Sequence, residues 1–259
     1  MKKDRGILIA QITDTHIVPE GKYWRSDSEA KTTERLELVI ENINKLSVQP
    51  DIVVHTGDIV DDGRIVSYEH ARKLLDKLKV KYFLTCGNHD NYDNLKQVFV
   101  DHNYLLDVEF SQYVVDFPEL SLIFLDTVVA NKEYGELCEY RIKWLEKRLK
   151  EMVKPTIIFL HHFPIDVENE LFENLNLIES EKLSSLISNQ NNVLGLYCGH
   201  YHYFKDGIFA GRQCWISPSV APTHILKSNG KVGLNYSSPS YSLHRFYKGK
   251  VSSEVKMLL

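Results

Sequence analysis

Short runs of β-branched and other apolar residues alternate along the chain with longer stretches in which apolar residues recur every three or four positions. The short runs predict buried strands, and the longer stretches predict amphipathic helices. The predicted strands cover 7–12, 52–55, 82–86, 112–117, 122–125, 156–160, 193–198 and 214–216. The predicted helices cover 33–46, 67–79, 139–152 and 179–188. This alternation is typical of an α/β sheet rather than of separate all-α and all-β domains.

Two connecting segments stand out from this pattern. Residues 19–31 form a polar stretch that carries Tyr23 and Trp24 and lies between the first strand and its helix. This stretch would overhang the strand end, either as a lid over a binding site or as an ordinary surface connection. Residues 217–241 are rich in Gly, Pro and Ser. They predict loops and turns with short strands.

The composition is that of an ordinary globular protein. Of 259 residues, 43% are hydrophobic and 25% are charged, which excludes the disordered classes. We interpret residues 1–259 as a single domain. The net charge is -4 and the two signs are interspersed, so the basic stripe that a nucleic-acid polymer requires is absent. No nucleic-acid partner and no membrane span are expected.

The cysteines and the N-terminus indicate a cytoplasmic protein. The four cysteines are scattered and form no CxxC pair, which is typical of free thiols in a reducing compartment. They are Cys86, Cys138, Cys198 and Cys214. The apolar stretch 6–10 is too short for the core of a signal peptide.

Polar residues capable of binding metal follow five of the predicted strands. In chain order they are Asp14 and His16, then Asp58, then Asn88, His89 and Asp90, then His161, then His200 and His202. In an open α/β sheet, ligands bind in the crevice beyond the carboxyl ends of the strands. We therefore expect these side chains to converge although they are far apart in the sequence.

The types of donor group in this set favour two divalent metal ions. Oxygen and imidazole donors without thiolate favour Mn, Fe, Zn, Co or Ni over an iron–sulfur cluster or a structural zinc–cysteine site. Two dications bring four positive charges, whereas Asp14 and Asp58 supply two negative ones. The positive excess suits a phosphate oxygen and lowers the pKa of a bound water. Hydrolysis of a phosphate ester follows from this balance.

Each motif taken alone has an ordinary structural explanation. Asp-x-His and Gly-Asp are common turn sequences, whereas Gly-Asn-His-Asp and Gly-His-x-His are harder to explain as turns. It is their joint occurrence at strand ends that favours a site. Several other residues are left as structural or surface groups: His55, His70, His102, His244, Cys86 and Cys198. His162 would touch substrate or support its loop, Asp126 would act behind the site or cap a helix, and His224 would face the cleft or not.

The ordered set Asp14-x-His16, Gly57-Asp58, Gly87-Asn88-His89-Asp90, His161 and Gly199-His200-x-His202 resembles the calcineurin-like metallophosphoesterases. Softer matches point to the class III cyclic nucleotide phosphodiesterase branch: Leu125-Asp126-Thr127, Gly135-x-Leu137, Trp144-Leu145 and Ser217-Pro218-Ser219. The resemblance implies a four-layer α/β sandwich in which two mixed β-sheets are flanked by α-helices. One departure is Phe163, which stands where the branch often has a proline.

The resemblance also implies roles for individual residues. One metal ion would be held by Asp14, His16, Asp58 and His202. The other would be held by Asp58, Asn88, His161 and His200, so that Asp58 bridges the two. Asn88, His89 and His200 would bind substrate, and His89 would act as transition-state stabiliser or general acid, oriented by Asp90.

The expected activity is hydrolysis of a small phosphodiester such as a cyclic nucleotide or a glycerophosphodiester. The alternatives are a phosphomonoesterase and a non-catalytic metal-bearing scaffold, and the second is disfavoured because every metal ligand is retained. The chain would act alone or as a homo-oligomer.

Overall fold

A five-stranded mixed sheet contains the first and the last strand of the structure. The computed structural model describes residues 5–105, 109–169, 172, 174–227 and 231–258. The strand order of this sheet is β13-β12-β1-β2-β3. Its strands are β1 (Ile7–Ile12), β2 (Ile52–His55), β3 (Tyr82–Leu84), β12 (Ser240–Tyr247) and β13 (Lys250–Met257). The first three are parallel, and β12 and β13 add to β1 as an antiparallel hairpin.

A second mixed sheet has six strands in the order β4-β5-β6-β7-β9-β8. They are β4 (Tyr113–Asp116), β5 (Ser121–Leu125), β6 (Thr156–Leu160), β7 (Val193–Cys198), β8 (Lys205–Phe209) and β9 (Arg212–Ile216). The four central strands β5, β6, β7 and β9 are parallel, and the edge strands β4 and β8 are antiparallel to their neighbours. Every residue of β5 and β6 is buried, as is typical of strands covered on both faces.

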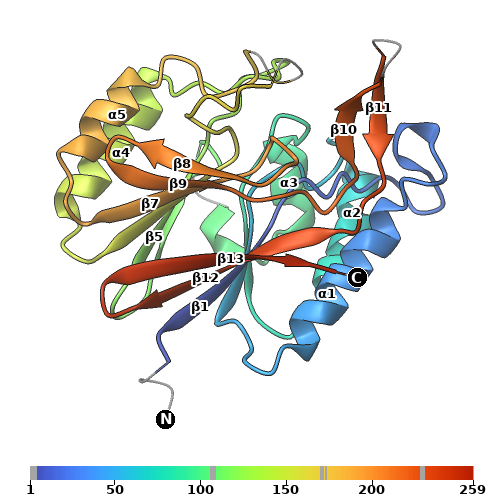
Figure 1. The fold of residues 1–259 in the computed structure, drawn as a ribbon, viewed down its shortest axis with the longest axis horizontal. Helices are drawn as coiled ribbons and strands as arrows, with labels where there is room; N and C mark the ends of the chain where they lie inside the picture. The colour runs from blue at the N-terminus through green and yellow to red at the C-terminus, as the bar shows by residue number, and fades with distance from the viewer. Residues whose placement is uncertain (1–4, 106–108, 170–171, 173, 228–230, 259) are drawn as a thin grey trace.

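Helices cover the outer faces of both sheets (Figure 1). They are α1 (Thr32–Lys45), α2 (Ile65–Leu75), α3 (Tyr92–Val98), α4 (Glu139–Glu151) and α5 (Glu181–Ser188). Apolar residues of α1 and α2 join a core cluster with the first sheet. Those of α4 and α5 form a separate cluster with the second sheet. The order helix, sheet, sheet, helix confirms the predicted four-layer α/β sandwich.

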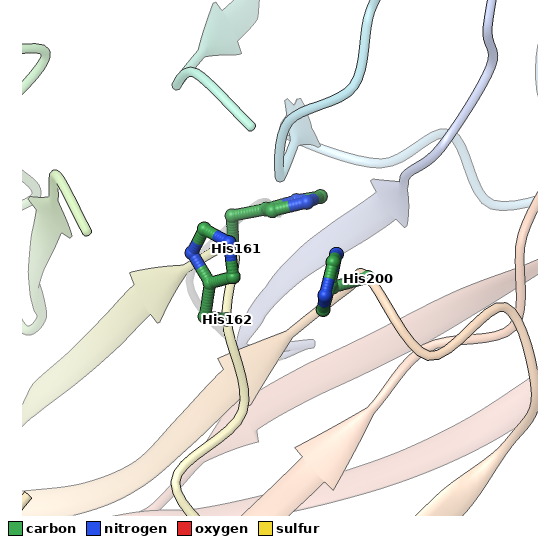
Figure 2. A group of neighbouring side chains, drawn as sticks. All are labelled: His161, His162 and His200. Carbon is green, nitrogen blue, oxygen red and sulfur yellow. The ribbon is translucent and has the colours of Figure 1, made fainter. Parts of the chain in front are cut away.

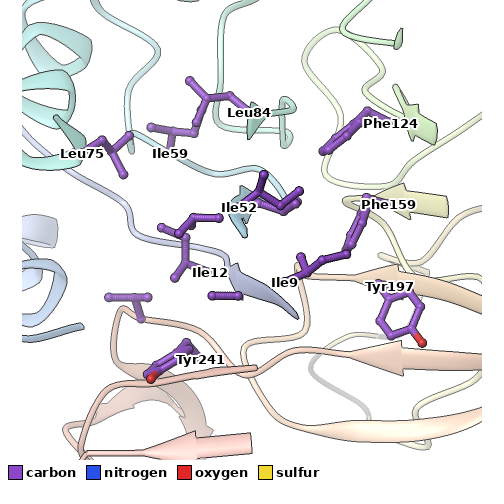
Figure 3. Packing of buried hydrophobic residues seen from close by; sticks show 14 of the residues in the cluster. Ile9, Ile12, Ile52, Ile59, Leu75, Leu84, Phe124, Phe159, Tyr197 and Tyr241 are labelled. Carbon is purple, nitrogen blue, oxygen red and sulfur yellow. The ribbon is translucent and has the colours of Figure 1, made fainter. Parts of the chain in front are cut away.

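The two sheets pack against each other through aromatic and branched side chains (Figure 3). Phe124 and Phe159 stack with ring centroids 5.5 Å apart, and Tyr197 lies 5.6 Å beyond Phe159. Such pairs add about 0.5–1.5 kcal/mol each beyond their buried area. A polar link also crosses this layer, because Gln11 on β1 donates to the carbonyl oxygen of Cys198 on β7. This hydrogen bond fixes the position of one sheet relative to the other near the strand ends.

Several predicted boundaries shift, and some elements were missed. The strand predicted at 82–86 ends at Leu84, and the helix predicted at 67–79 covers Ile65–Leu75. Helix α3 has only seven residues, too few to show helical periodicity. Strands β8, β12 and β13 were not predicted. Residues 217–241 contain the expected short strands, β10 (Thr223–Leu226) and β11 (Val232–Asn235). None of the helices in the described residues has the length and apolar character that a membrane crossing requires.

Candidate metal centre

The predicted site residues come together where the carboxyl ends of β1 and β2 face those of β6 and β7. Two groups of side chains place ligand atoms within 4.8 Å of one another and combine residues from different sheets. One consists of Asp14, His16 and His202, and the other of Asp14, Asp58 and His161. The convergence expected from the strand-end pattern is therefore present.

Asp14, His16 and His202 form the first half of the cluster. The Nε2 atoms of His16 and His202 lie 3.2 Å apart. The distance from His202 Nε2 to Asp14 Oδ1 is 3.5 Å. Asp14 and His202 are almost fully buried, so these donor atoms face one another in a small enclosed space.

Asn88, His161 and His200 line the second half. His161 Nε2 lies 3.1 Å from Asn88 Oδ1 and 3.4 Å from Asp58 Oδ2. The same oxygen of Asp58 lies 3.7 Å from His16 Nε2 in the first half. Asp58 Oδ2 thus stands between both halves, the position that a bridging ligand requires.

These distances fit metal coordination. Bonds of about 2.0–2.1 Å from one ion place neighbouring ligand atoms about 3.0–3.4 Å apart, and the closest pairs measured here fall in or near that range. Burial holds the pKa of His200 and of His202 well below its ordinary value. Both imidazoles are therefore in the neutral form that binds metal. The donor set fits two transition-metal ions, and nothing in it selects one metal over another.

Asp58 carries the charge at the centre of the site. Burial opposes ionisation of this carboxyl group, but the imidazoles of His161 and His89 hold its pKa well below the usual value. Burial likewise opposes charge on His161, yet Asp58 raises the pKa of that imidazole to about 9. A carboxylate with imidazole groups on two sides is suited to accept cations.

The ligand-bearing turns have an unusual backbone. Asp14, His16, Asp58, His200 and His202 all have positive φ, between 44° and 69°. Such conformations cost about 1–3 kcal/mol each in non-glycine residues and cluster at functional sites. Hydrogen bonds between turns hold them in place, since Asp14 N–H donates to the Gly57 carbonyl oxygen and His200 N–H to the Asp14 carboxylate.

Asp61, which belongs to none of the predicted motifs, orients His89 and lies beside His16. The Nδ1–H of His89 donates to its backbone carbonyl oxygen at 2.8 Å. Its carboxylate lies 3.3 Å from His16 Nδ1. Asp90, expected to orient His89, instead accepts from Gly87 N–H and from the Tyr68 hydroxyl. Asp90 therefore fixes the loop, and Asp61 has the orienting position.

His89 stands at the opening of the site. One third of its side chain is exposed, and it lines a cleft of about 300 Å³ together with the metal-ligand candidates. Burial lowers the pKa of His89, but Asp58 and Asp61 outweigh that effect and raise it above the ordinary value. Because Nδ1 donates to Asp61, Nε2 is the nitrogen that faces the cleft.

The segment 19–31 forms a wall of the cleft. Trp24 is 1% exposed, donates from Nε1 to Asp61 Oδ1 at 2.7 Å and stacks on the His16 ring at 4.8 Å. The neighbouring Arg25 reaches the cleft with its guanidinium 5.2 Å from the Trp24 ring centroid. The segment is thus more than a surface connection. A lone tryptophan in a polar loop was the signal for this role.

The outer rim of the cleft combines charged and apolar side chains. It consists of Arg25, Glu133, Phe172, Leu175, His224 and Val232. His224 therefore does face the cleft. Asp126 does not: it is buried beside Arg141 at 3.3 Å and accepts from Ser111 N–H, so it anchors the loop after β5.

The remaining histidines behave as structural groups. His55 is buried and hydrogen-bonded to Thr15. His70 donates to the Val18 carbonyl oxygen, and His244 contacts Gln11 and Ser253. His162 lies beside His161 and His200 (Figure 2). It is completely buried, so it supports its loop and does not touch substrate.

The family model for the calcineurin-like phosphoesterases matches residues 7–204. A probable glycerophosphodiester phosphodiesterase GpdQ from Arcobacter nitrofigilis is 32% identical over 245 residues, covering 92% of this chain and 88% of the relative. The 3',5'-cyclic adenosine monophosphate phosphodiesterase CpdA of Escherichia coli is 26% identical over 215 residues, covering 83% and 76%.

A solved structure has the same fold. The dimetal phosphatase from Danio rerio superposes with a TM-score of 0.72 at 14% identity, covering 98% of this chain and 97% of that one. Because the matched family model spans all five strands that carry the metal-ligand candidates, the chain belongs to the calcineurin-like phosphoesterase family and is a phosphoesterase.

Proposed function

We propose that this enzyme hydrolyses small phosphodiesters, of the cyclic nucleotide or glycerophosphodiester type, at a dinuclear centre of divalent Mn, Fe or Zn-type ions. The observation that carries the proposal is the position of Asp58 Oδ2, 3.4 Å from His161 Nε2 and 3.7 Å from His16 Nε2. One ion would be held by Asp14, His16, Asp58 and His202. The other would be held by Asp58, Asn88, His161 and His200.

The metal ions, when bound, supply Lewis acidity that polarises the ester and activates water. The protein side chains position the substrate around them. His89 presents Nε2 to the cleft. As an imidazolium it would either stabilise the transferring phosphate through a hydrogen bond or donate its Nε2 proton to the leaving alkoxide. Asn88 and His200 line the same cleft and would also contact the phosphate.

The apolar side chains at the rim favour a diester over a monoester. Phe172, Leu175 and Val232 line the same cleft as the metal-ligand candidates, where they would contact the second organic group of a diester. A monoester has no such group. The named activities of the GpdQ and CpdA relatives point to the same substrate class.

The test is hydrolysis by the purified chain reconstituted with Mn²⁺, Fe²⁺, Zn²⁺ or Co²⁺. We expect kcat/KM for bis(4-nitrophenyl) phosphate to exceed that for 4-nitrophenyl phosphate, and the loss of both activities in Asp58→Ala. A higher kcat/KM for the monoester with every metal would establish the phosphomonoesterase alternative. Full activity of Asp58→Ala would refute the site itself.

We also infer a cytoplasmic location. Its support is the state of the four cysteines, all of which have free thiols, as is usual in a reducing compartment. A homo-oligomeric state stays a prediction.

A further inference from the structure

Two imidazoles assigned to metal, those of His16 and His200, have a buried ring nitrogen without a hydrogen-bond partner among the described residues. The nitrogen of His16 has the Asp61 carboxylate 3.3 Å away, whereas within the described part of the chain no carboxylate pairs with that of His200, Nε2. His161 donates from Nδ1 to the Thr56 carbonyl oxygen at 2.8 Å, and His202 from Nδ1 to that of Pro222 at 3.2 Å. Histidines that bind metal nearly always have such a partner, which fixes the tautomer and the ring orientation. Since the His200 ring also lines the cleft, Nδ1 is the nitrogen left to face it.

His162 carries a matching unpartnered nitrogen. Its Nε2 is likewise buried, and no described residue forms a hydrogen bond with it. The His162 and His200 rings are 4.6 Å apart, and one ring nitrogen of each, with one of His161, lies within 4.8 Å of the others. Figure 2 shows the three imidazoles gathered in this way. A buried nitrogen left unpaired costs free energy, and one water molecule between the two rings would satisfy both.

Thr127 and the loop at Gly135 enclose the Nδ1 edge of His162. Its Nδ1 lies 2.8 Å from the hydroxyl oxygen of Thr127. The loop at Gly135 packs against the same edge, because a Cβ there would come 2.6 Å from Nδ1. A hydroxyl oxygen can accept from Nδ1–H, and in that tautomer the lone pair of His162 is on Nε2.

We propose that His162 is a positioning residue for the metal ligand His200. Its Nε2 accepts the Nε2–H of His200 through one water molecule, and so fixes His200 in the tautomer that presents Nδ1 to metal. This rests on the proposed dinuclear site. The loop that packs against His162 at Gly135 also carries Glu133, which lines the cleft.

Two conservative substitutions separate this role from packing. His162→Gln places an amide oxygen near the Nε2 position, whereas His162→Asn keeps a polar group near Thr127 and has nothing at Nε2. Binding of Zn²⁺ and of Mn²⁺ to the metal-stripped full chain is measured by calorimetry. We expect His162→Asn to weaken one of the two binding events by about 10–100-fold. In His162→Gln the same event should keep an affinity within a few-fold of that of the parent. The control His102→Leu removes another imidazole bound to a hydroxyl, that of Tyr104, and should leave both events unchanged.

A spectroscopic readout uses the Co²⁺-loaded protein. The exchangeable imidazole N–H of His200 should give a paramagnetically shifted proton signal in the parent and in His162→Gln, and it should be lost in His162→Asn. Equal metal affinities for the parent, Gln and Asn would overturn the proposal, as would equal losses in Gln and Asn. A change in the Co²⁺ coordination number in Asn would make His162 a ligand instead. Failure of diester hydrolysis with this binding pattern intact would refute only the proposed activity.

Discussion

The buried, neutral His244 should make the fold less stable in mild acid, because the unfolded chain takes up a proton at this residue first. This residue of β12 is completely buried, and desolvation lowers its pKa from 6.5 to about 3. Gln11 Nε2 donates elsewhere, to Thr56 and to Cys198, so Gln11 Oε1 accepts from His244 Nε2–H. The neutral ring is thereby fully bonded.

The difference between the folded and unfolded pKa of His244 sets how the free energy of unfolding changes with pH. Because the folded pKa is below the unfolded one, the unfolded chain binds the proton first as the pH falls below about 6.5. The contribution of His244 to the free energy of unfolding is fully present above that pH. It falls by about 1.4 kcal/mol per pH unit as the pH drops toward 3. Between pH 7 and pH 5 the loss is about 2 kcal/mol.

The assay is urea unfolding of the parent and of His244→Gln at several pH values. The amide of Gln can still donate to Gln11 but does not titrate. The difference between the two unfolding free energies should therefore change by about 2 kcal/mol between pH 7 and pH 5. Ser253→Ala removes a partner of His244 but keeps the imidazole, and it should retain the dependence of the parent. Parallel curves for the parent and His244→Gln would refute the reasoning.

Three further predictions concern the metal centre. Asp58→Asn should weaken metal binding, measured by calorimetry, because both ions lose a carboxylate ligand. The loss should exceed the ~100-fold that removal of an orienting partner costs, and an unchanged affinity would contradict the bridging role. His89→Asn should lower kcat by about 10²–10⁴-fold while metal binding stays as in the parent, and loss of metal would make His89 a ligand instead. Removal of metal with a chelator should lower Tm in calorimetric scans. One ion at 100 times its Kd adds about 2.7 kcal/mol to the free energy of unfolding, which corresponds to roughly 5–10 °C for a chain of this size. An unchanged Tm would argue against a preformed site.

The parallel strands and the convergence of the strand ends were predictable because buried strands are short, apolar and bounded by turn residues. The strands 7–12, 52–55, 156–160 and 193–198 were predicted with the boundaries that the structure has. Strand β13 was missed because Ser253 interrupts the apolar residues of its half-buried face and Lys250, Ser252 and Glu254 occupy the exposed face. Its place at the sheet edge is set by pairing with β12, a long-range contact that no local pattern encodes.

The supporting residues of the site were the harder part to predict. Asp61 and Trp24 act through contacts between segments that are 37 positions apart in the chain, and neither lies directly after a strand. The resemblance to the calcineurin-like metallophosphoesterases implied that Asp90 orients His89, yet successive side chains in a turn diverge. The carboxylate of Asp90 bonds to Ile59 N–H and Gly87 N–H instead.

The glycines in the strand-end motifs explain why weak motifs become specific when taken together. A Cβ on Gly87 would lie 2.2 Å from Asp58 Oδ1, and a Cβ on Gly199 would lie 2.0 Å from Thr13 Oγ1 and 2.8 Å from Asp14 Oδ2. Each glycine therefore makes room for a ligand that belongs to another motif. Asp, Asn and His, which tolerate positive φ better than other side chains, then turn the backbone sharply at the ligand positions. A turn needs only one such motif, whereas a metal centre built from several strand ends needs all of them at once.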